Sequence, residues 1–448
     1  MADDPQSTSR VREGLARAMA RLGAGEVTAL TRLSGGANME SWSFDWGGGG
    51  YVLRRAPSAQ MMAGRALSLE QEARIIRAVR AAGVRAPQIV VELAPEDGLG
   101  AGFVMGRITG EVSPTAILAD PPPSLLADIA RELAAVHRTP PAALEGAPRM
   151  DTAEALAGLK ARFAAYGGDR PILALAIRWL EDNLPAPAPP ALVHGDLRMG
   201  NLIVAPEGLA AVLDWELAHI GDAHEDLAFG CMTVWRFGHI ERPAFGLGSL
   251  EDFFAAYEAE SGTTVDPVRF RFWLIYRTLW WALGCLQMGD HWRSRADRSL
   301  ERVVIARRAS ENELDLLLLL EEAAPAAERE RPLPPPAPAA PERIGEPDAR
   351  ELLAAVAEWL ESDVKARSAG REKFLAAVAI NALGIAGREL GGGARAEDAD
   401  LARDLLGGRL GLASPGVLAR LRRMAIDKLA ADVPKYAALA RARLLWNG

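Results

Sequence analysis

Three polar residues stand at a fixed spacing near the middle of this 448-residue chain. Asp196 follows an apolar run, Asn201 comes five residues later, and Asp214 comes thirteen residues after Asn201, directly behind a second apolar run. A carboxylate can accept the proton of a hydroxyl group, while a second carboxylate and an amide can hold the Mg²⁺ that bridges nucleotide phosphates. The pattern therefore predicts phosphoryl transfer, with Asp196 as the catalytic base and Asn201 and Asp214 as metal ligands.

Each of these residues has a plainer explanation when it is taken alone. Asp214 would be a turn residue that ends a strand, and Asn201 would be an ordinary turn former. His194, two residues before Asp196, is interpreted as a packing residue that orients the backbone rather than a group that reacts. Only the order and the spacing of the three residues together favour the catalytic interpretation.

The run His194-Gly195-Asp196, with Asn201 five residues beyond the aspartate, resembles the catalytic loop of the aminoglycoside phosphotransferase family of small-molecule kinases. Gly195 stands where the protein-kinase loop has arginine. The resemblance covers most of the chain before residue 320 and implies an α+β class with a two-lobed, protein-kinase-like fold. It also implies ATP and Mg²⁺ as cofactors and the hydroxyl group of a small molecule as phosphate acceptor.

A glycine-containing turn between two strand-like runs is the first candidate for phosphate binding. Its residues are Ser34, Gly35, Gly36 and Asn38. Backbone N–H groups in such a turn can approach phosphate oxygens closely. The glycine run 47–50 is interpreted as a hairpin connection only, although it is richer in glycine.

Arg54 is the expected phosphate clamp. Alternation along the strand 51–55 places Arg54 on one face and Arg55 on the other. The resemblance implies a lysine on this strand, yet the first lysine of the chain is Lys160. A guanidinium is permanently charged and can bind two phosphate oxygens at once, so Arg54 can replace that lysine.

The amphipathic helix expected over residues 68–79 should supply a carboxylate that pairs with Arg54. Glu72 matches the position that the resemblance implies better than Glu70 does. Glu70 and Arg74 fit a solvated face of the same helix.

Two further segments resemble parts of the family. The strand 101–106 should lead into the hinge between the lobes, where the backbone of Met105 and Arg107 would contact adenine; a plain surface turn is the alternative. In the segment 221–229, the resemblance implies that Asp226 braces the catalytic loop.

Composition excludes several classes of protein. The net charge of −8 offers no basic surface for nucleic acid. Two cysteines, Cys231 and Cys285, favour a reducing, cytoplasmic location over a disulfide framework, and no cluster has zinc spacing. The N-terminus lacks the apolar segment of a secretory signal. The apolar run 314–320 is too short to cross a bilayer and predicts a core helix, so no membrane partner is expected. The oligomeric state stays open.

Four segments are expected along the chain. Residues 1–107 form a kinase-like N-lobe with a small antiparallel sheet and one helix, and residues 108–322 form a helical C-lobe that bears the catalytic loop. Residues 323–347 are a proline- and alanine-rich linker. Residues 348–448 form an all-α domain that resembles an uncharacterised helical domain found beside bacterial phosphotransferases, and the resemblance implies no mechanism.

Two helices leave a choice between packing and function. Trp273, Tyr276, Trp280 and Trp281 should lie in a core helix, although a tryptophan face can also line an acceptor pocket. In the helix 371–390, Asn381 is expected as a hydrogen-bonded core residue.

The sequence thus predicts a small-molecule kinase. The strand at Arg54 and the segment 213–216 look closest to the kinase-like domains joined to acyl-CoA dehydrogenase family members 10 and 11, which suggests a hydroxyacyl-CoA or a related hydroxy acid as acceptor. Two alternatives remain. The missing lysine would suit a nucleotide-binding pseudokinase, and the C-terminal helices would suit an interaction module.

Overall fold

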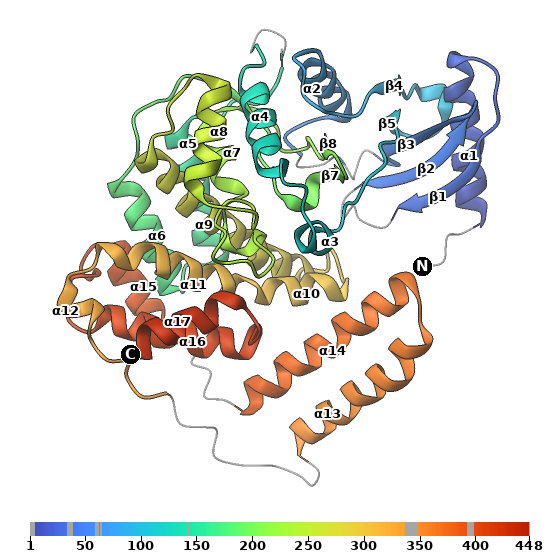
Figure 1. The fold of residues 1–448 in the computed structure, drawn as a ribbon. Coiled ribbons are helices and arrows are strands. Elements are labelled where there is room, and N and C mark those ends of the chain that lie inside the picture. Colours follow the sequence, from blue (N-terminus) through green and yellow to red (C-terminus); the bar gives the residue numbers. More distant parts are fainter. Residues whose placement is uncertain are drawn as a thin grey trace.

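The computed structural model describes residues 5–33, 39–58, 62, 65–140, 144, 146–336, 348–391 and 398–447. A small lobe built on a sheet lies beside a larger helical lobe, and the C-terminal helices follow below the larger lobe (Figure 1). This arrangement confirms the predicted two-lobed α+β fold with a C-terminal helical region.

The small lobe is an antiparallel sheet with the strand order β1-β2-β3-β5-β4. Gly47 and Gly48, with φ of 55° and 84°, turn the chain between β2 and β3, so the hairpin interpretation of this glycine run is confirmed. Arg54 of β3 lies opposite Phe103 of β5. The strands are β1 (Thr28–Leu33), β2 (Glu40–Trp46), β3 (Gly49–Ala56), β4 (Ile89–Glu92) and β5 (Ala101–Gly106).

One helix covers each face of this sheet, so the prediction of a single helix in the small lobe is wrong. The additional helix is α1 (Pro5–Met19), followed by the 3-10 turn Ala20–Leu22. Its buried side chains Val11, Leu15 and Ala18 recur at helical spacing and pack on the face of the sheet that carries Leu53.

The helix α2 (Leu69–Ala81) covers the opposite face. Ser68 accepts a hydrogen bond from the backbone N–H of Gln71 (3.1 Å), and the Gln71 side chain accepts one from the Ser68 N–H (2.8 Å). This capping box fixes the start of the helix. It turns Glu72 towards the sheet, whereas Glu70 stays exposed.

The large lobe is organised around the long helix α9, which buries Phe272, Trp273, Tyr276 and Leu279. Two small two-stranded sheets frame the segment that bears Asp196, Asn201 and Asp214: β6 pairs with β9, and the hairpin strands β7 and β8 pair with each other. The helices are α3 (Pro114–Ala119), α4 (Leu125–His137), α5 (Thr152–Tyr166), α6 (Pro171–Asp182), α7 (Ala223–Phe229), α8 (Leu250–Ser261), α9 (Pro267–Arg293), α10 (Leu300–Arg307), α11 (Ala309–Leu320) and α12 (Ala326–Arg329). The strands are β6 (Ala191–Val193), β7 (Leu202–Ala205), β8 (Gly208–Val212) and β9 (His219–Gly221).

The helix α11 contains the apolar run 314–320 and is buried, as predicted. Its acidic residues are also buried, and they are paired: Glu313 with Lys428 (2.6 Å) and Asp315 with the Tyr436 hydroxyl (2.6 Å). No helix in the described ranges is both long and apolar enough to cross a membrane.

The C-terminal helices divide into two groups. Leu405, Leu421 and Leu439, on three successive helices, lie in the same hydrophobic core as the large lobe. The preceding two helices instead form a projecting hairpin (Figure 1). The first group is α15 (Ala399–Leu406), α16 (Val417–Asp432) and α17 (Ala437–Asn447), and the second is α13 (Ala349–Trp359), a π-helical turn (Leu360–Lys365) and α14 (Gly370–Gly391).

The projecting hairpin overturns one prediction. Asn381 of α14 is exposed and is not a core residue, and Phe374 on the same helix is 53% exposed. Apolar periodicity shows that a helix has an apolar face but does not show what covers that face. The helices α15–α17 pack against the large lobe, although residues 323–347 separate them from it in the sequence. The predicted domain boundary at residues 323–347 therefore stays a prediction.

Candidate active site

Asp196 lies on the loop that follows β6, and Asn201 holds it there. The side-chain amide of Asn201 donates to the backbone oxygen of Asp196 (2.8 Å) and to its carboxylate Oδ2 (2.8 Å). Arg198 donates from Nε to the other carboxylate oxygen, Oδ1, at 3.0 Å. Both oxygens of the proposed base are therefore fixed by neighbours on its own loop.

Asp226, at the start of α7, anchors this loop from below. Its fully buried carboxylate accepts hydrogen bonds from the backbone N–H groups of His194 (2.6 Å) and Gly195 (2.9 Å). Burial disfavours its charge, but His137 and His194, including the His194 backbone N–H, outweigh burial and lower the pKa of Asp226. This is the bracing contact that the sequence predicts for Asp226.

His194 joins the segment of Asp196 to the segment that leads to Asp214. Its Nε2 lies 3.0 Å from the Leu213 carbonyl, and the Asp196 N–H donates to its Nδ1 at 3.2 Å. These contacts fit the tautomer protonated at Nε2. The ring packs 4.5 Å from the ring of Trp215, so His194 orients the backbone, as expected.

Gly195 has a conformation that other residues adopt only with strain. Its φ is +82°, and a Cβ on it would lie 2.6 Å from the carbonyl oxygen of Leu217. Arg277, itself paired with Glu225 at 2.9 Å, donates to the carbonyl of Gly195. The glycine in place of the protein-kinase arginine therefore has a steric reason in this loop.

Asp214 follows β8 and reaches the same site. The backbone N–H of Leu213 donates to the Asn201 carbonyl at 2.8 Å, which places the two predicted metal ligands on adjacent segments. Asp214 has φ of +64°, a left-handed conformation that aspartate tolerates better than most residues. Such a conformation persists only where the surroundings impose it, and it is common at functional sites.

Arg54 connects the two lobes at this point. Its Nε lies 2.9 Å from Glu72 Oε1, an ion pair outside hydrogen-bond alignment. Its Nη2 donates to Asp214 (3.0 Å) and to Glu216 (2.7 Å). Burial opposes its charge, but the three carboxylates outweigh burial and raise the pKa of Arg54.

The carboxylates around Arg54 respond differently to burial. Burial raises the pKa of Glu72 to about 7 despite Arg54. Burial also raises the pKa of Asp214, helped by the negative charges of Glu216 and Asp196. For Glu216, Arg54 and Arg65 outweigh burial and lower the pKa. The site therefore contains carboxylates of unequal proton affinity within one network.

Two members of this network, Glu216 and Arg65, were missed by sequence reasoning. Arg65 donates to Glu216 at 2.9 Å, and Glu216 in turn accepts from Arg54. The only sequence signal was a third carboxylate two residues beyond Asp214. Arg65 precedes α2 in an irregular segment and gave no signal.

Of the other residues predicted to bind the nucleotide, the structure describes Met105 and Arg107 but not the phosphate turn. Met105 lies in β5 opposite Val52. The Arg107 N–H donates to the Gly50 carbonyl at 2.9 Å, and the Arg107 side chain pairs with Asp45 at 2.7 Å. An adenine could not use that N–H in this arrangement. The predicted phosphate-turn residues Ser34, Gly35, Gly36 and Asn38 lie outside the described residues.

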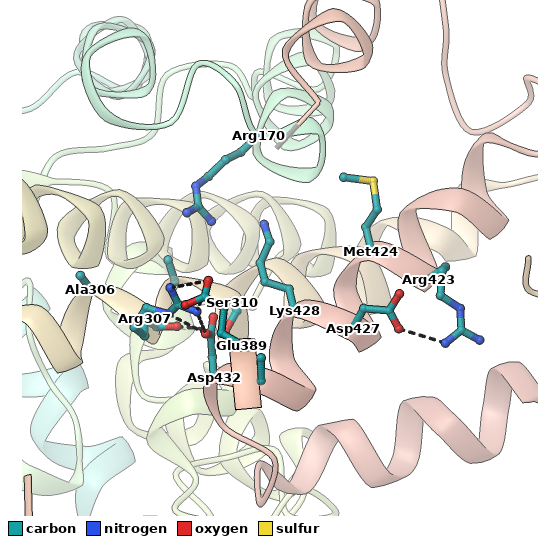
Figure 2. A pocket seen from close by; sticks show the side chains of 12 residues that line it. Arg170, Ala306, Arg307, Ser310, Glu389, Arg423, Met424, Asp427, Lys428 and Asp432 are labelled. Carbon is teal, nitrogen blue, oxygen red and sulfur yellow. Dashed lines mark hydrogen bonds and ion pairs between the residues drawn. The ribbon is translucent and has the colours of Figure 1, made fainter. Parts of the chain in front are cut away.

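A separate cavity of about 120 Å³ lies where α10, α11 and α16 meet (Figure 2). Figure 2 shows ion pairs among its charged side chains, Arg307 with Asp432 (2.6 Å) and Arg423 with Asp427 (3.1 Å). None of the predicted site residues lines it. We interpret it as part of the ion-paired seam that joins the C-terminal helices to the large lobe.

Comparison with known proteins found two family models that match parts of this chain. A model of the phosphotransferase enzyme family matches residues 29–264, and a model of a domain of unknown function matches residues 366–436. Acyl-CoA dehydrogenase family member 10 of Mus musculus is 28% identical over 246 residues, which cover 48% of this chain and 22% of that protein. Acyl-CoA dehydrogenase family member 11 of Gallus gallus is 28% identical over 245 residues, which cover 52% of this chain and 31% of that protein.

The chain thus spans less than a third of the length of these relatives. Among solved structures, an aminoglycoside phosphotransferase in ternary complex with AMP-PNP and hygromycin B is 19% identical, with a TM-score of 0.48; the match covers 68% of this chain and 98% of that one. The family match includes 236 of the 448 residues. On that match, the chain belongs to the phosphotransferase enzyme family.

Proposed function

We propose that this protein transfers the γ-phosphoryl group of ATP to a hydroxyl group of a small molecule. The observation that carries the proposal is the convergence of Asp196, Asn201, Asp214 and Arg54 from both lobes into one network of contacts. Side chains of these types at one point suit phosphoryl transfer, in which positioning and charge stabilisation do most of the work.

Asp196 serves as the general base. It accepts the proton of the acceptor hydroxyl while that oxygen forms a bond to the γ-phosphorus, and the bond from this phosphorus to the β,γ-bridging oxygen breaks, releasing ADP. Arg198 and Asn201 hold the carboxylate oxygens of Asp196, so the base is oriented before the acceptor arrives. Asp226 acts indirectly, because its carboxylate is bonded to the backbone of the loop and to His137.

Asn201 and Asp214 would hold Mg²⁺. The donor set fits: Asp214 offers a carboxylate, and Asn201 has its Oδ1 left once its amide nitrogen is bonded to Asp196. Mg²⁺ prefers oxygen ligands and commonly takes only one or two from the protein beside substrate phosphates. When bound, the ion neutralises charge that develops on the phosphates. The described residues contain no group of three or more His, Cys, Asp or Glu side chains arranged as a metal site.

Arg54 would contact the nucleotide phosphates with Glu72 as its anchor. The Glu72 side chain is 2% exposed and pairs with Nε, which leaves the Nη groups to the solvent-facing carboxylates Asp214 and Glu216. Phosphate oxygens can therefore replace those carboxylates while the anchor stays in place. We assign the phosphate turn to Ser34, Gly35, Gly36 and Asn38. We assign the adenine contact to the backbone of Met105 and Arg107, and for Arg107 to its carbonyl oxygen, because its N–H is bonded to Gly50.

The acceptor that we propose is a hydroxyacyl-CoA or a related hydroxy acid. The support is the similarity to the regions of acyl-CoA dehydrogenase family members 10 and 11 that this chain matches. We also propose a reducing, cytoplasmic location, because both cysteines are free thiols in the structure.

One observation favours a second candidate, a pseudokinase. Arg54 replaces the usual lysine and is bound by three carboxylates, which nucleotide phosphates must displace in part. The test is incubation of the purified chain with ATP, Mg²⁺ and a set of hydroxyacyl-CoAs, hydroxy acids, sugars and amino alcohols, followed by mass spectrometry. A gain of one phosphate on an acceptor supports the kinase. Nucleotide-dependent thermal stabilisation without transfer to any acceptor supports the pseudokinase instead.

A further inference from the structure

Two indole N–H groups near the catalytic loop are buried without a hydrogen-bond partner among the residues that the structure describes. They belong to Trp235, in the 3-10 turn Thr233–Trp235, and to Trp281 of α9. The two rings lie 5.2 Å apart, and Trp235 is 7% exposed. Buried donors in folded proteins are nearly always satisfied. An acceptor from outside the described residues, a water molecule or an oxygen atom of a ligand, would satisfy this pair.

Arg198 connects these rings to the catalytic base. Its guanidinium carbon lies 4.7 Å from the centre of the Trp235 ring, and its Nε donates to Asp196 at 3.0 Å. A Cβ at Gly200 would clash with Nη1 of Arg198, so the glycine leaves room for this side chain. A run of direct contacts thus leads from Asp196 through Arg198 to Trp235 and Trp281.

The side chains that continue this cluster beyond the two indole rings are also aromatic or cationic. Arg277 packs 4.6 Å from the Phe229 ring and 4.8 Å from the Trp280 ring, and Arg162 lies 5.5 Å from Trp280. The carboxylate that contacts Arg277 is Glu225, which is fully buried and forms an ion pair with it. Guanidinium and indole groups donate hydrogen bonds and accept none, so this side of Asp196 favours an acceptor rich in oxygen over a cationic one.

We infer that the phosphate acceptor carries an anionic oxygen group, a carboxylate or a phosphate, close to its reactive hydroxyl. Arg198 and the indole N–H groups of Trp235 and Trp281 bind that group and thereby place the hydroxyl beside Asp196. This inference rests on the proposed function and narrows its class of acceptor to molecules that carry such a group. Arg198 also retains its contact with Asp196, so the two parts of the site are coupled through one side chain.

Nuclear magnetic resonance of the full chain with nitrogen-15-labelled tryptophan tests binding without requiring turnover. With AMP-PNP and Mg²⁺ present, the chain is titrated with lactate and its neutral analogue lactamide, and with glycerol phosphate and glycerol. The indole signals of Trp235 and Trp281 are assigned from Trp235→Phe and Trp281→Phe. We expect the chemical shifts of both indole signals to change when an anion is added and to stay unchanged with its neutral analogue. Comparison of the lactate and glycerol phosphate titrations shows which anion is preferred.

Internal controls are available in the same spectra. The indoles of Trp42 and Trp446 already donate to Glu40 (3.3 Å) and Glu321 (3.1 Å), so their signals should not move. For any acceptor found to be phosphorylated, Trp281→Phe should raise the acceptor KM about tenfold and leave the ATP KM unchanged, because a hydrogen bond to a charged group is lost while the ring remains.

Signals that stay fixed with both anions, or that move equally with lactamide, overturn the inference. Failure of the proposed function gives a different result. In that case the indole signals respond to anions, but no acceptor gains phosphate from ATP. Phosphorylation confined to neutral or cationic acceptors, with no change of KM in Trp281→Phe, supports the kinase and rejects the anionic acceptor.

Discussion

Arg54 and Asp214, from opposite lobes, form an ion pair of 3.0 Å. The proposed phosphate clamp thus contacts a proposed metal ligand directly. A cation bound to Asp214 and phosphates bound to Arg54 would each compete with this ion pair. Metal binding and phosphate binding should therefore be coupled. Glu72, which pairs with Nε of Arg54 at 2.9 Å, can keep Arg54 in place when the Asp214 carboxylate binds a cation instead.

Asp196→Asn should leave nucleotide affinity nearly unchanged and lower kcat by about 10²-fold or more, which is the usual range for loss of a general base. The amide keeps the shape of the carboxylate but cannot take the proton. Steady-state kinetics and calorimetric titration with AMP-PNP measure the two effects. Asp226→Asn is the matched control: it should lower the melting temperature, because the buried Asp226 carboxylate accepts two backbone hydrogen bonds. An unchanged kcat in Asp196→Asn removes this residue from the role of base.

Asp214→Ala should lower the apparent affinity for Mg²⁺ in the presence of nucleotide at least tenfold. Losing even an outer-shell partner of a metal site costs about 10–100-fold in affinity, and Asp214 is proposed as a direct ligand. Magnesium titration at fixed AMP-PNP gives the change. Glu216→Gln serves as control, since it alters the same Arg54 network without removing a proposed ligand. If the two variants show the same metal dependence as the native chain, the assignment of the metal to Asp214 is wrong.

Arg54→Ala should raise the ATP KM and lower kcat together, because it removes charge from phosphates in both the ground state and the transition state. Arg54→Lys should recover only part of the activity, since an ammonium cannot replace the three-way pairing of the guanidinium. Arg55→Ala is the control on the opposite face. Arg55 pairs with Glu40 at 2.7 Å and donates to the Leu99 carbonyl at 3.2 Å, so its loss should reduce stability and spare ATP affinity.

The reverse result for these two arginines, with ATP binding lost in Arg55→Ala and kept in Arg54→Ala, contradicts the assigned clamp. If neither substitution changes ATP kinetics in an active enzyme, the nucleotide is bound elsewhere than at β3.

Stability should depend on the protonation of Glu72. Burial raises its pKa from the ordinary value of 4.5 to about 7, so the folded chain holds a proton that the unfolded chain has lost within this interval. The contribution of Glu72 to stability is therefore greatest at low pH, falls as the pH rises from 4.5 to about 7, and levels off above that. Glu72→Gln should remove this part of the slope in thermal melts at a series of pH values. The same slope in both proteins contradicts the shifted pKa.

Gly195→Ala should lower both the melting temperature and kcat. A left-handed conformation costs a residue with a Cβ roughly 1–2 kcal/mol, and the new Cβ would also lie 2.6 Å from the Leu217 carbonyl. Relief of that contact shifts the backbone next to Asp196. Gly158→Ala, in the helix α5 with no atom within 4 Å of the new Cβ, is the control and should stabilise the chain slightly. Unchanged kcat in Gly195→Ala means that the loop tolerates a Cβ without moving the base.

Local sequence was sufficient to predict that Asp196, Asn201 and Asp214 lie near one another. Asp196, Asn201 and Asp214 lie within nineteen residues of one another, and the β7–β8 hairpin between the last two fixes their relation. The choice of Glu72 over Glu70 came instead from the resemblance to the family. The hairpin and the strand alternation that separates Arg54 from Arg55 are both local. These relations depend on periods of a few residues, which neighbouring residues impose on one another whatever the rest of the chain does.

Relations between distant segments were decided by the tertiary structure. Arg54 meets Asp214 and Glu216 across 160 and 162 residues, and the contact exists only because many apolar side chains dock the two lobes in one orientation. The same holds for α15–α17, whose leucines complete the core of the large lobe, and for the exposed Asn381. Periodicity tells which face of a helix is apolar, but burial depends on which other surface arrives there, and that choice is made by the whole chain.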